Sequence, residues 1–282
     1  MKIGKFDVLE ELGKGAGSTV FKVRRHEDCQ VYALKVVKVQ DADDKRYIDQ
    51  LLHEYDIGGK LNHPHLCKIY ALELDKSLLG KPHGGRLLLE YVKGVPLSTL
   101  KTLNLGKLLV VFAKTAAALA HMHALGFYHA DVKPDNILVT ADGDVRLIDF
   151  GVAWRRGEEK GRIQGTPDYL APEQVRKKVA NAKTDVFNLG ATMYHMFSGD
   201  VIHEGFRTKG ASKFGKLDDL VRPITDLKPD FPKEIDAFVR KCIAFYPDDR
   251  PDSMKDVFRA LKEFVARREA GKAKRRREKD GE

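Results

Sequence analysis

The sequence predicts an α+β protein with a strand-rich first part and a helix-rich second part. Residues 5–39 contain three alternating or continuously apolar runs separated by glycine or polar turns, which is typical of neighbouring strands. Residues 106–125 form a long apolar stretch that is closed by Gly126, which is typical of a buried helix. The change of pattern falls near 91–96, so we expect two structural parts.

The first part is predicted to contain five strands and one helix. The strands are expected at 5–12, 18–26, 30–39, 67–74 and 86–92. A helix within 41–60 has its apolar residues near helical spacing and ends at Gly58 and Gly59. The segment between the last two strands, 75–85, is rich in turn residues, so we expect an exposed loop there.

The second part is predicted to be mainly helical. Short strands are expected at 137–140 and 145–148, and helices at 106–125, 184–198, 233–245 and 253–267. The last residues form a basic, mixed-charge tail without an apolar face. The predicted organisation is therefore an N-terminal lobe at 1–91, a C-terminal lobe at 92–266 and a tail at 267–282.

Composition limits the class of protein. The 282 residues are 43% hydrophobic, which is enough for a core, and the net charge of +9 suits several anionic partners without selecting one. Three widely spaced cysteines form no metal or disulfide pattern, so a cytoplasmic location is expected. The N-terminus has no signal-peptide pattern, and the apolar stretch 108–120 is too short to span a bilayer.

Glycines punctuate the turn between the first two long strands. Gly13, Gly15 and Gly17 would let the backbone approach a ligand closely and offer N–H groups to phosphate oxygens. The alternative is a flexible hairpin without a ligand. No Gly-Lys-Ser/Thr opens a helix here, so the segment is not a P-loop, and the absence of a following helix argues against a dinucleotide fingerprint.

Lys35 lies in an otherwise apolar strand. A buried ammonium group is costly unless it is paired, and Glu54 on the predicted helix is the expected partner. Asp49 and Asp56 are competing partners. The alternative is that Lys35 reaches solvent from an edge strand.

Polar residues crowd the segment 128–138, YHADVKPDNIL. Asp131 is suited to accept or orient the proton of an attacking hydroxyl group, and Lys133 to neutralise a transferring phosphoryl group. Asn136 and, after the next apolar strand, Asp149 offer oxygen atoms of the kind that Mg²⁺ prefers.

These motifs together resemble one family, the eukaryotic-type serine/threonine protein kinases in their bacterial form. In order, the motifs are Gly13-x-Gly15-x-x-Ser18-x-Val20, Ala33-x-Lys35, Glu54, His129-Ala130-Asp131-x-Lys133-x-x-Asn136, Asp149-Phe150-Gly151 and Ala171-Pro172-Glu173. The resemblance covers residues 6–266. It implies a bilobal kinase-like fold, with a small strand-rich N-terminal lobe that has one main helix and a larger helical C-terminal lobe.

The resemblance also implies a role for each matched residue. Asp131 is similar to the catalytic base, Lys133 to the γ-phosphate contact, and Asn136 with Asp149 to the Mg²⁺ ligands. Lys35 would contact the α- and β-phosphates and pair with Glu54. The remaining nucleotide contacts would come from the lid, the hinge and the adenine pocket: Leu12, Gly13, Lys14, Gly15, Ala16, Gly17, Ser18, Thr19 and Val20; Leu89, Glu90 and Val92; Ala33 and Leu138. Core packing is the alternative role of Val20, Ala33 and Leu138.

The segment GTPDYLAPE at 165–173 indicates a peptide substrate, because small-molecule kinases of related fold generally lack it. By the same resemblance, Thr166 hydrogen-bonds the catalytic Asp and Lys, which goes with serine or threonine acceptors. Glu173 would pair with Arg250 to anchor the substrate platform, and Asp185 would brace the catalytic loop.

Three positions depart from the family pattern. Ser18 replaces the third glycine of the lid, and Ala130 replaces an Arg that in this family binds a phosphate on the activation segment. Residues 149–165 contain no Ser, Thr or Tyr, so both halves of that switch are missing. Gly58 stands where an apolar side chain usually packs toward Phe150, so the helix that ends there is expected to be mobile.

We therefore expect an ATP- and Mg²⁺-dependent protein serine/threonine kinase, with Mn²⁺ as an alternative ion, that does not need activation-segment phosphorylation. The alternatives are an ATP-binding pseudokinase or scaffold and a small-molecule kinase of related fold. The expected partner is a protein with acceptor Ser or Thr residues, and no nucleic acid. The tail at 267–282 is expected to be a solvated linker, with peripheral contact to a membrane or an acidic partner as the alternative.

Overall fold

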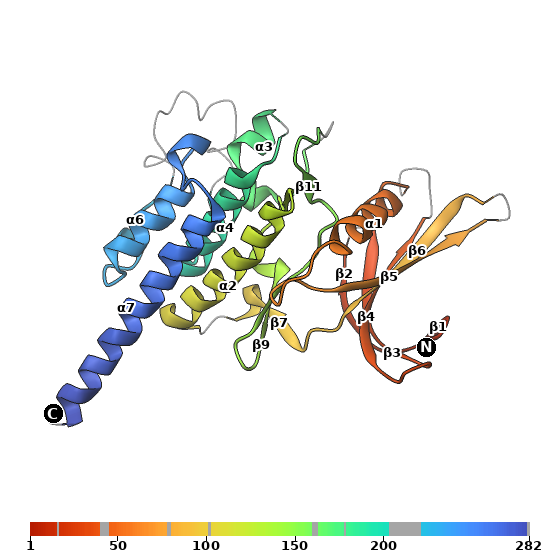
Figure 1. Ribbon diagram of the computed structural model, residues 1–282, viewed down its shortest axis with the longest axis horizontal. Helices are drawn as coiled ribbons and strands as arrows, with labels where there is room; N and C mark the ends of the chain where they lie inside the picture. Colours follow the sequence, from red (N-terminus) through yellow and green to blue (C-terminus); the bar gives the residue numbers. More distant parts are fainter. Residues whose placement is uncertain are drawn as a thin grey trace. The chain divides into compact units, whose positions relative to one another are not determined.

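The computed structural model describes residues 1–15, 17–39, 45–77, 80–100, 103–159, 163–177, 179–202 and 221–280. The chain divides into two compact units. The first comprises Met1–Gly94 with Ile148–Val152, and the second comprises Val95–Leu147 with Ala153–Glu282. The first unit is built on a sheet and the second on helices (Figure 1), so the predicted α+β class is confirmed.

The first unit is a six-stranded antiparallel sheet with one helix packed against it. The strand order is β1-β2-β3-β4-β6-β5. The bounds are β1 Lys2–Ile3, β2 Phe6–Lys14, β3 Ser18–Arg25, β4 Val31–Lys38, β5 Ile69–Lys76, β6 Pro82–Glu90 and helix α1 Lys45–Gly58. The helix ends at Gly58, as predicted.

Alternation along β4 gives the sheet two apolar faces. Leu34 and Val36 pack with Phe6, Val23 and Leu88 on one face. Val37 packs on the opposite face with Ile48 and Leu51 of α1, together with Leu87. Successive side chains of a strand point to opposite faces, so Lys35 shares the helix-facing side with Val37.

The loop predicted at 75–85 is shorter than expected, because strands occupy both of its ends, although most of its described residues are exposed. β5 and β6 continue through it as a hairpin, with Asp75 opposite Gly84 and Lys76 opposite Pro82. Gly84 and Gly85 are buried. A Cβ atom on Gly85 would lie 2.8 Å from a methyl carbon of Leu51, so this glycine serves close packing rather than a turn.

The second unit is mainly helical (Figure 1). Its helices are α2 Leu105–Ala124, α3 Pro172–Lys177, α4 Ala182–Ser198, α5 Ile224–Leu227, α6 Lys233–Cys242 and α7 Met254–Asp280, with short 3₁₀ turns at Leu97–Thr99, Pro134–Asn136, Pro167–Tyr169 and Pro247–Asp249. In one small sheet, the middle strand β9 Ile137–Thr140 lies between β10 Val145–Leu147 and β7 Gly94–Pro96. In another, β11 Trp154–Arg155 pairs with β8 Phe127–Tyr128.

Side chains cap the two central helices of this unit. The Asn104 side chain accepts a hydrogen bond from the Lys107 N–H at the start of α2. Asn181 and Thr184 form a reciprocal capping box at the start of α4. Such caps satisfy backbone N–H groups that a helix leaves without partners, which explains where both helices begin.

Helix α2 is longer than the apolar stretch seen in the sequence. With 20 residues it is long and apolar enough, by length and composition alone, to cross a membrane, so the length argument made from 108–120 is wrong. Of its most apolar window, 56% is buried inside the protein. Helix α2 lies against α4 and α7, as a core helix does.

Helix α7 continues beyond the end predicted from the sequence, through the tail to Asp280. Arg, Lys, Glu and Ala dominate this part and are good helix formers, and Arg267 pairs with Glu263 one turn earlier at 3.8 Å. The helix propensity of these residues is therefore by itself sufficient to predict a helical tail. The side chains from 274 onward lie outside the described residues, and contact with an anionic partner stays a prediction.

Candidate active site

Lys35 of β4 pairs with the buried carboxylate of Glu54 on α1. Lys35 Nζ lies 2.7 Å from Glu54 Oε2 and 3.2 Å from Asp149 Oδ1. The short distance to Glu54 confirms the predicted partner. Asp56, one of the competing partners, pairs instead with Lys60 at 2.9 Å. β4 is flanked by β3 and β6, so the alternative of an edge-strand lysine is wrong. The helix-facing side of β4 is what brings Lys35 to Glu54.

The neighbouring carboxylates and burial shift the pKa values of Lys35 and Glu54. Burial by itself lowers the pKa of the Lys35 ammonium, but the Asp149 and Glu54 carboxylates outweigh burial and raise that pKa. Burial raises the pKa of Glu54, and Lys35 opposes that shift. Lys35 therefore stays a cation, which suits a contact with phosphate oxygens.

The glycine-rich segment forms a tight turn between β2 and β3. The Gly15 N–H donates to the Ser18 carbonyl at 2.8 Å. Gly13 lies opposite Val20 in the sheet. Leu12, Gly13 and Lys14 end β2, whereas Ser18, Thr19 and Val20 begin β3. The turn is thus present where the lid was predicted, while Ala16 lies outside the described residues.

Tyr47 was missed as a neighbour of this turn. A Cβ atom on Gly17 would lie 2.2 Å from the Tyr47 ring on α1, so only glycine fits at that position. Tyr47 was noted in the sequence only as part of an apolar helix face. A ring-to-glycine contact between residues 30 positions apart leaves no sequence signal.

The predicted hinge begins at the end of β6. Leu89 lies opposite Ala33 of β4, so one predicted hinge residue and one predicted adenine contact are neighbours. The Glu90 N–H donates to the Lys68 carbonyl at 2.9 Å. The Glu90 carbonyl accepts from Cys67 Sγ at 3.8 Å, and the adenine contact of Glu90 stays a prediction. Val92 follows in the connection to β7, and Leu138 lies in β9 of the second unit.

Gly58 leaves no gap in the packing at the end of α1. A Cβ atom there would lie 2.2 Å from Ile69 Cδ1 and 3.3 Å from the Phe150 ring. Ile69 of β5 fills the space that an apolar side chain at position 58 would occupy. The mobility of the helix stays a prediction.

In the second unit, a set of hydrogen bonds holds Asp131 in place. The Thr166 N–H donates to Asp131 Oδ1 at 2.7 Å, and Asn136 Nδ2 donates to Asp131 Oδ2 at 3.3 Å. Lys133 Nζ lies 3.2 Å from Asp131 Oδ2 and donates to the Thr166 hydroxyl at 2.6 Å. The predicted Thr166 contacts are present, but the contact with Asp131 comes from the backbone N–H rather than from the hydroxyl group.

Asp185 of α4 holds the loop that carries Asp131. Its buried carboxylate accepts from the backbone N–H of His129 at 2.9 Å and of Ala130 at 2.7 Å. These two bonds support Ala130 in the left-handed region, with φ of 61°, which is uncommon for a residue with a side chain. The predicted bracing role of Asp185 is confirmed.

The Ala130 methyl group lies in an apolar cluster. It is buried and packs with Tyr128 and Trp154, together with Ala180 and Ala182. Trp154 belongs to the segment that follows Asp149, and its strand β11 pairs with β8 directly before the loop. The position that the family pattern gives to a charged Arg is thus apolar here.

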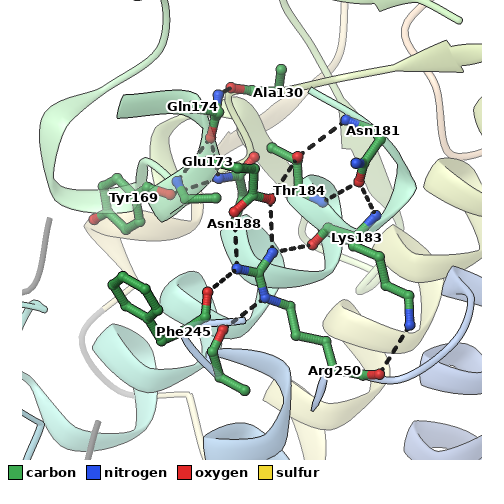
Figure 2. A network of polar contacts seen from close by, with 12 residues as sticks. Ala130, Tyr169, Glu173, Gln174, Asn181, Lys183, Thr184, Asn188, Phe245 and Arg250 are labelled. Atoms are coloured by element: carbon green, nitrogen blue, oxygen red, sulfur yellow. Dashed lines mark hydrogen bonds and ion pairs between the residues drawn. The ribbon is translucent and has the colours of Figure 1, made fainter. Parts of the chain in front are cut away.

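Glu173 and Arg250 form the predicted ion pair, which is buried and bidentate (Figure 2). Arg250 Nη1 and Nη2 donate to the two carboxylate oxygens of Glu173 at 2.8 Å and 2.9 Å. The guanidinium group also donates to the carbonyls of Ala244, Lys183 and Phe245. Every charge in this pair is compensated.

The residues present fit a divalent cation by their donor chemistry. The Asn136 amide nitrogen is used in bonds to Asp131, so its side-chain oxygen is the atom suited to a metal. The Asp149 side chain is 45% exposed, which leaves it accessible to a ligand. Among the residues described, no group of three or more His, Cys, Asp or Glu side chains could hold a metal ion.

Comparison with known proteins matches residues 6–261 to the protein kinase domain. The chain belongs to this family. The predicted kinase-like fold is confirmed, and the two clusters around Lys35 and Asp131 contain the residues that the family resemblance assigned. Members of this family use ATP with a divalent metal ion and act on proteins.

Relatives of this chain include serine/threonine-protein kinases from a plant and from bacteria. The AtPK1/AtPK6 kinase of Arabidopsis thaliana is 33% identical over 222 residues, which is 76% of this chain and 46% of that protein. The PknK kinase of Mycobacterium bovis is 30% identical over 93% of this chain and 24% of that protein. The PrkC kinase of Bacillus subtilis is 25% identical over 90% of this chain and 39% of that protein. The chain thus spans less than half the length of these relatives.

Proposed function

We propose that this kinase domain transfers the γ-phosphoryl group of ATP to serine and threonine hydroxyl groups of protein substrates. The observation that carries the proposal is the cluster of Asp131, Lys133 and Thr166, in which the Thr166 hydroxyl accepts from Lys133 and its N–H donates to Asp131. A carboxylate, an ammonium and a neighbouring peptide-platform residue are the groups that such a transfer requires.

Each residue of the cluster has a different role in the proposed phosphoryl transfer. Asp131 orients the acceptor hydroxyl and accepts its proton through the carboxylate that Thr166 and Asn136 hold. Lys133 stabilises negative charge on the transferring group. In the other unit, Lys35, kept cationic by Glu54, contacts the nucleotide phosphates. Mg²⁺, with Asn136 and Asp149 as oxygen ligands and Mn²⁺ as an alternative, would neutralise phosphate charge when bound.

Incubation with γ-labelled ATP and Mg²⁺ tests the proposal. The acceptors are three peptides that differ only in carrying Ser, Thr or Tyr at one position. We expect label on the Ser and Thr peptides and at least tenfold less on the Tyr peptide. Label on a small molecule alone, or on none of the peptides, contradicts the proposal.

We also propose that transfer does not require phosphorylation of the segment 149–165. Two observations support this proposal: the segment has no hydroxyl side chain, and Ala130 packs against its Trp154. Phosphatase treatment of the purified protein, followed by removal of the phosphatase, should leave the rate of peptide phosphorylation within twofold of the untreated rate. A large loss of activity that maps to a phosphate in this segment would falsify the idea.

A further inference from the structure

Gln174, the residue after the Ala-Pro-Glu motif, has a buried side chain with four hydrogen-bond contacts (Figure 2). It is 2% exposed. Its Nε2 donates to the Ala130 carbonyl at 2.9 Å and, through a longer bond, to the Gln164 carbonyl at 3.4 Å. Its Oε1 accepts from the Ala171 N–H at 2.9 Å and from Asn188 Nδ2 at 3.0 Å. None of these contacts involves a charged group.

Only one orientation of the amide fits its surroundings. The two N–H groups face two carbonyl oxygens, and the carbonyl oxygen faces two donors, so the whole hydrogen-bonding capacity of the side chain is used. A flipped amide, or a carboxylate in its place, would set oxygen against oxygen at Ala130 and Gln164. A buried amide in this position is therefore specific for glutamine rather than for any polar residue.

These contacts join the loop that carries Asp131 to the end of the segment that carries Thr166. Ala130 directly precedes Asp131, and Gln164 lies two residues before Thr166. Gly165, with φ of 117°, permits the close approach between them. A Cβ atom on Gly165 would lie 3.1 Å from the Ala130 carbonyl oxygen and 2.7 Å from a Leu170 methyl carbon.

We infer that Gln174 is a positioning residue that fixes the segment 164–166 on the catalytic loop with uncharged hydrogen bonds. It does so beside the apolar cluster of Tyr128, Ala130 and Trp154. The Thr166 N–H then stays aligned with Asp131 Oδ1 in every molecule, without a modification. The inference rests on the proposed phosphoryl transfer, because Gln174 acts through Thr166 and Asp131 and not on a reacting atom.

The test compares Gln174→Met, which keeps the volume and removes the hydrogen bonds, with Gln174→Glu, which keeps the shape and removes the donors. Asp236→Asn is the control, since Asp236 is similarly buried in the same unit and its bonds go to Ile224 and Thr225. We expect both Gln174 variants to lower kcat about ten- to hundredfold, with KM for ATP within twofold of wild type. The control should leave kcat within threefold.

Hydrogen exchange of the wild type and Gln174→Met adds a measurement that does not depend on activity. Peptides covering 163–171 should exchange at least tenfold faster in the variant, while peptides of α6 should not change. A Gln174→Met enzyme with kcat within twofold of wild type overturns the inference, as does a loss of kcat that the control matches. If the wild type transfers no phosphate at all, the proposed function fails. Unchanged exchange at 163–171 would then separately overturn the positioning role.

Discussion

Replacing Asp131 by Asn is expected to lower kcat roughly 10²–10⁴-fold, the contribution usual for a positioned proton acceptor. The substitution keeps the size of the side chain, and its amide oxygen can still accept from the Thr166 N–H. It removes the negative charge beside Lys133 and leaves no group that can accept a proton from a substrate hydroxyl. The loss should therefore appear in the chemical step.

Single-turnover phosphorylation of a serine peptide measures that step, and a nucleotide thermal shift measures ATP binding separately. Asp135→Asn is the matched control, because Asp135 lies in the same loop but accepts from the Ser98 hydroxyl at 2.6 Å. We expect the control to keep kcat within about threefold. An Asp131→Asn protein that binds ATP and transfers phosphate at the wild-type rate would remove Asp131 from the mechanism.

Replacing Glu173 by Gln is expected to cost about 3–5 kcal/mol of the free energy of unfolding, because it leaves the buried Arg250 cation without its counter-charge. The Arg250 side chain is fully buried, and the Glu173 side chain is 5% exposed. The Thr184 hydroxyl also donates to Glu173 Oε1 at 2.8 Å, so the carboxylate supports α4 as well as the platform. Solvent cannot compensate the loss.

Urea denaturation followed by tryptophan fluorescence measures the free energy of unfolding of the second unit. Trp154 is the single tryptophan of the sequence and lies in the same unit as Glu173 and Arg250. Glu263→Gln is the matched control, since Glu263 forms an exposed pair with Arg267 on α7. Exposed pairs contribute about 0–1 kcal/mol, so the control should barely move the midpoint. Equal shifts in both variants would show that burial of the Glu173 pair is not what stabilises it.

Much of the fold could be predicted because local patterns coincide with the elements that form. The period-two runs became β2, β3 and β4, and the apolar run closed by Gly126 became α2. The two largest errors came from residues whose local signal was ambiguous. Gly84 and Gly85 indicated a turn but serve close packing within a hairpin, and the helix predicted to end at 267 continues as α7 through the charged tail to Asp280. Glycine occurs both in turns and where strands pack closely, and charged helix-forming residues occur both in helices and in linkers. The tertiary contacts of each segment select between these structures.

The candidate site divides in a similar way. A lysine in an apolar strand needs an acidic partner, so the sequence predicted that Lys35 pairs with an acidic residue of the following helix. Glu54 was the expected partner, and Asp49 and Asp56 were the competing ones. Which acid it is follows from the face of β4 that α1 covers, a tertiary fact. The Thr166 hydrogen bonds were expected from the motif, yet the bond to Asp131 comes from the backbone, which residue identity does not encode.

The sequence by itself determined the fold class, the family and the identity of the polar residues of the two clusters, because each depends on residue type at fixed spacing. Only the tertiary structure decided how the missing Arg at position 130 is compensated. There, Ala130 packs in one cluster with Tyr128 and Trp154, and Gln174 joins Ala130 to Gln164 by hydrogen bonds. Those contacts link residues up to 44 positions apart. Close packing and the pairing of buried polar groups depend on which surfaces meet, and no local pattern specifies that.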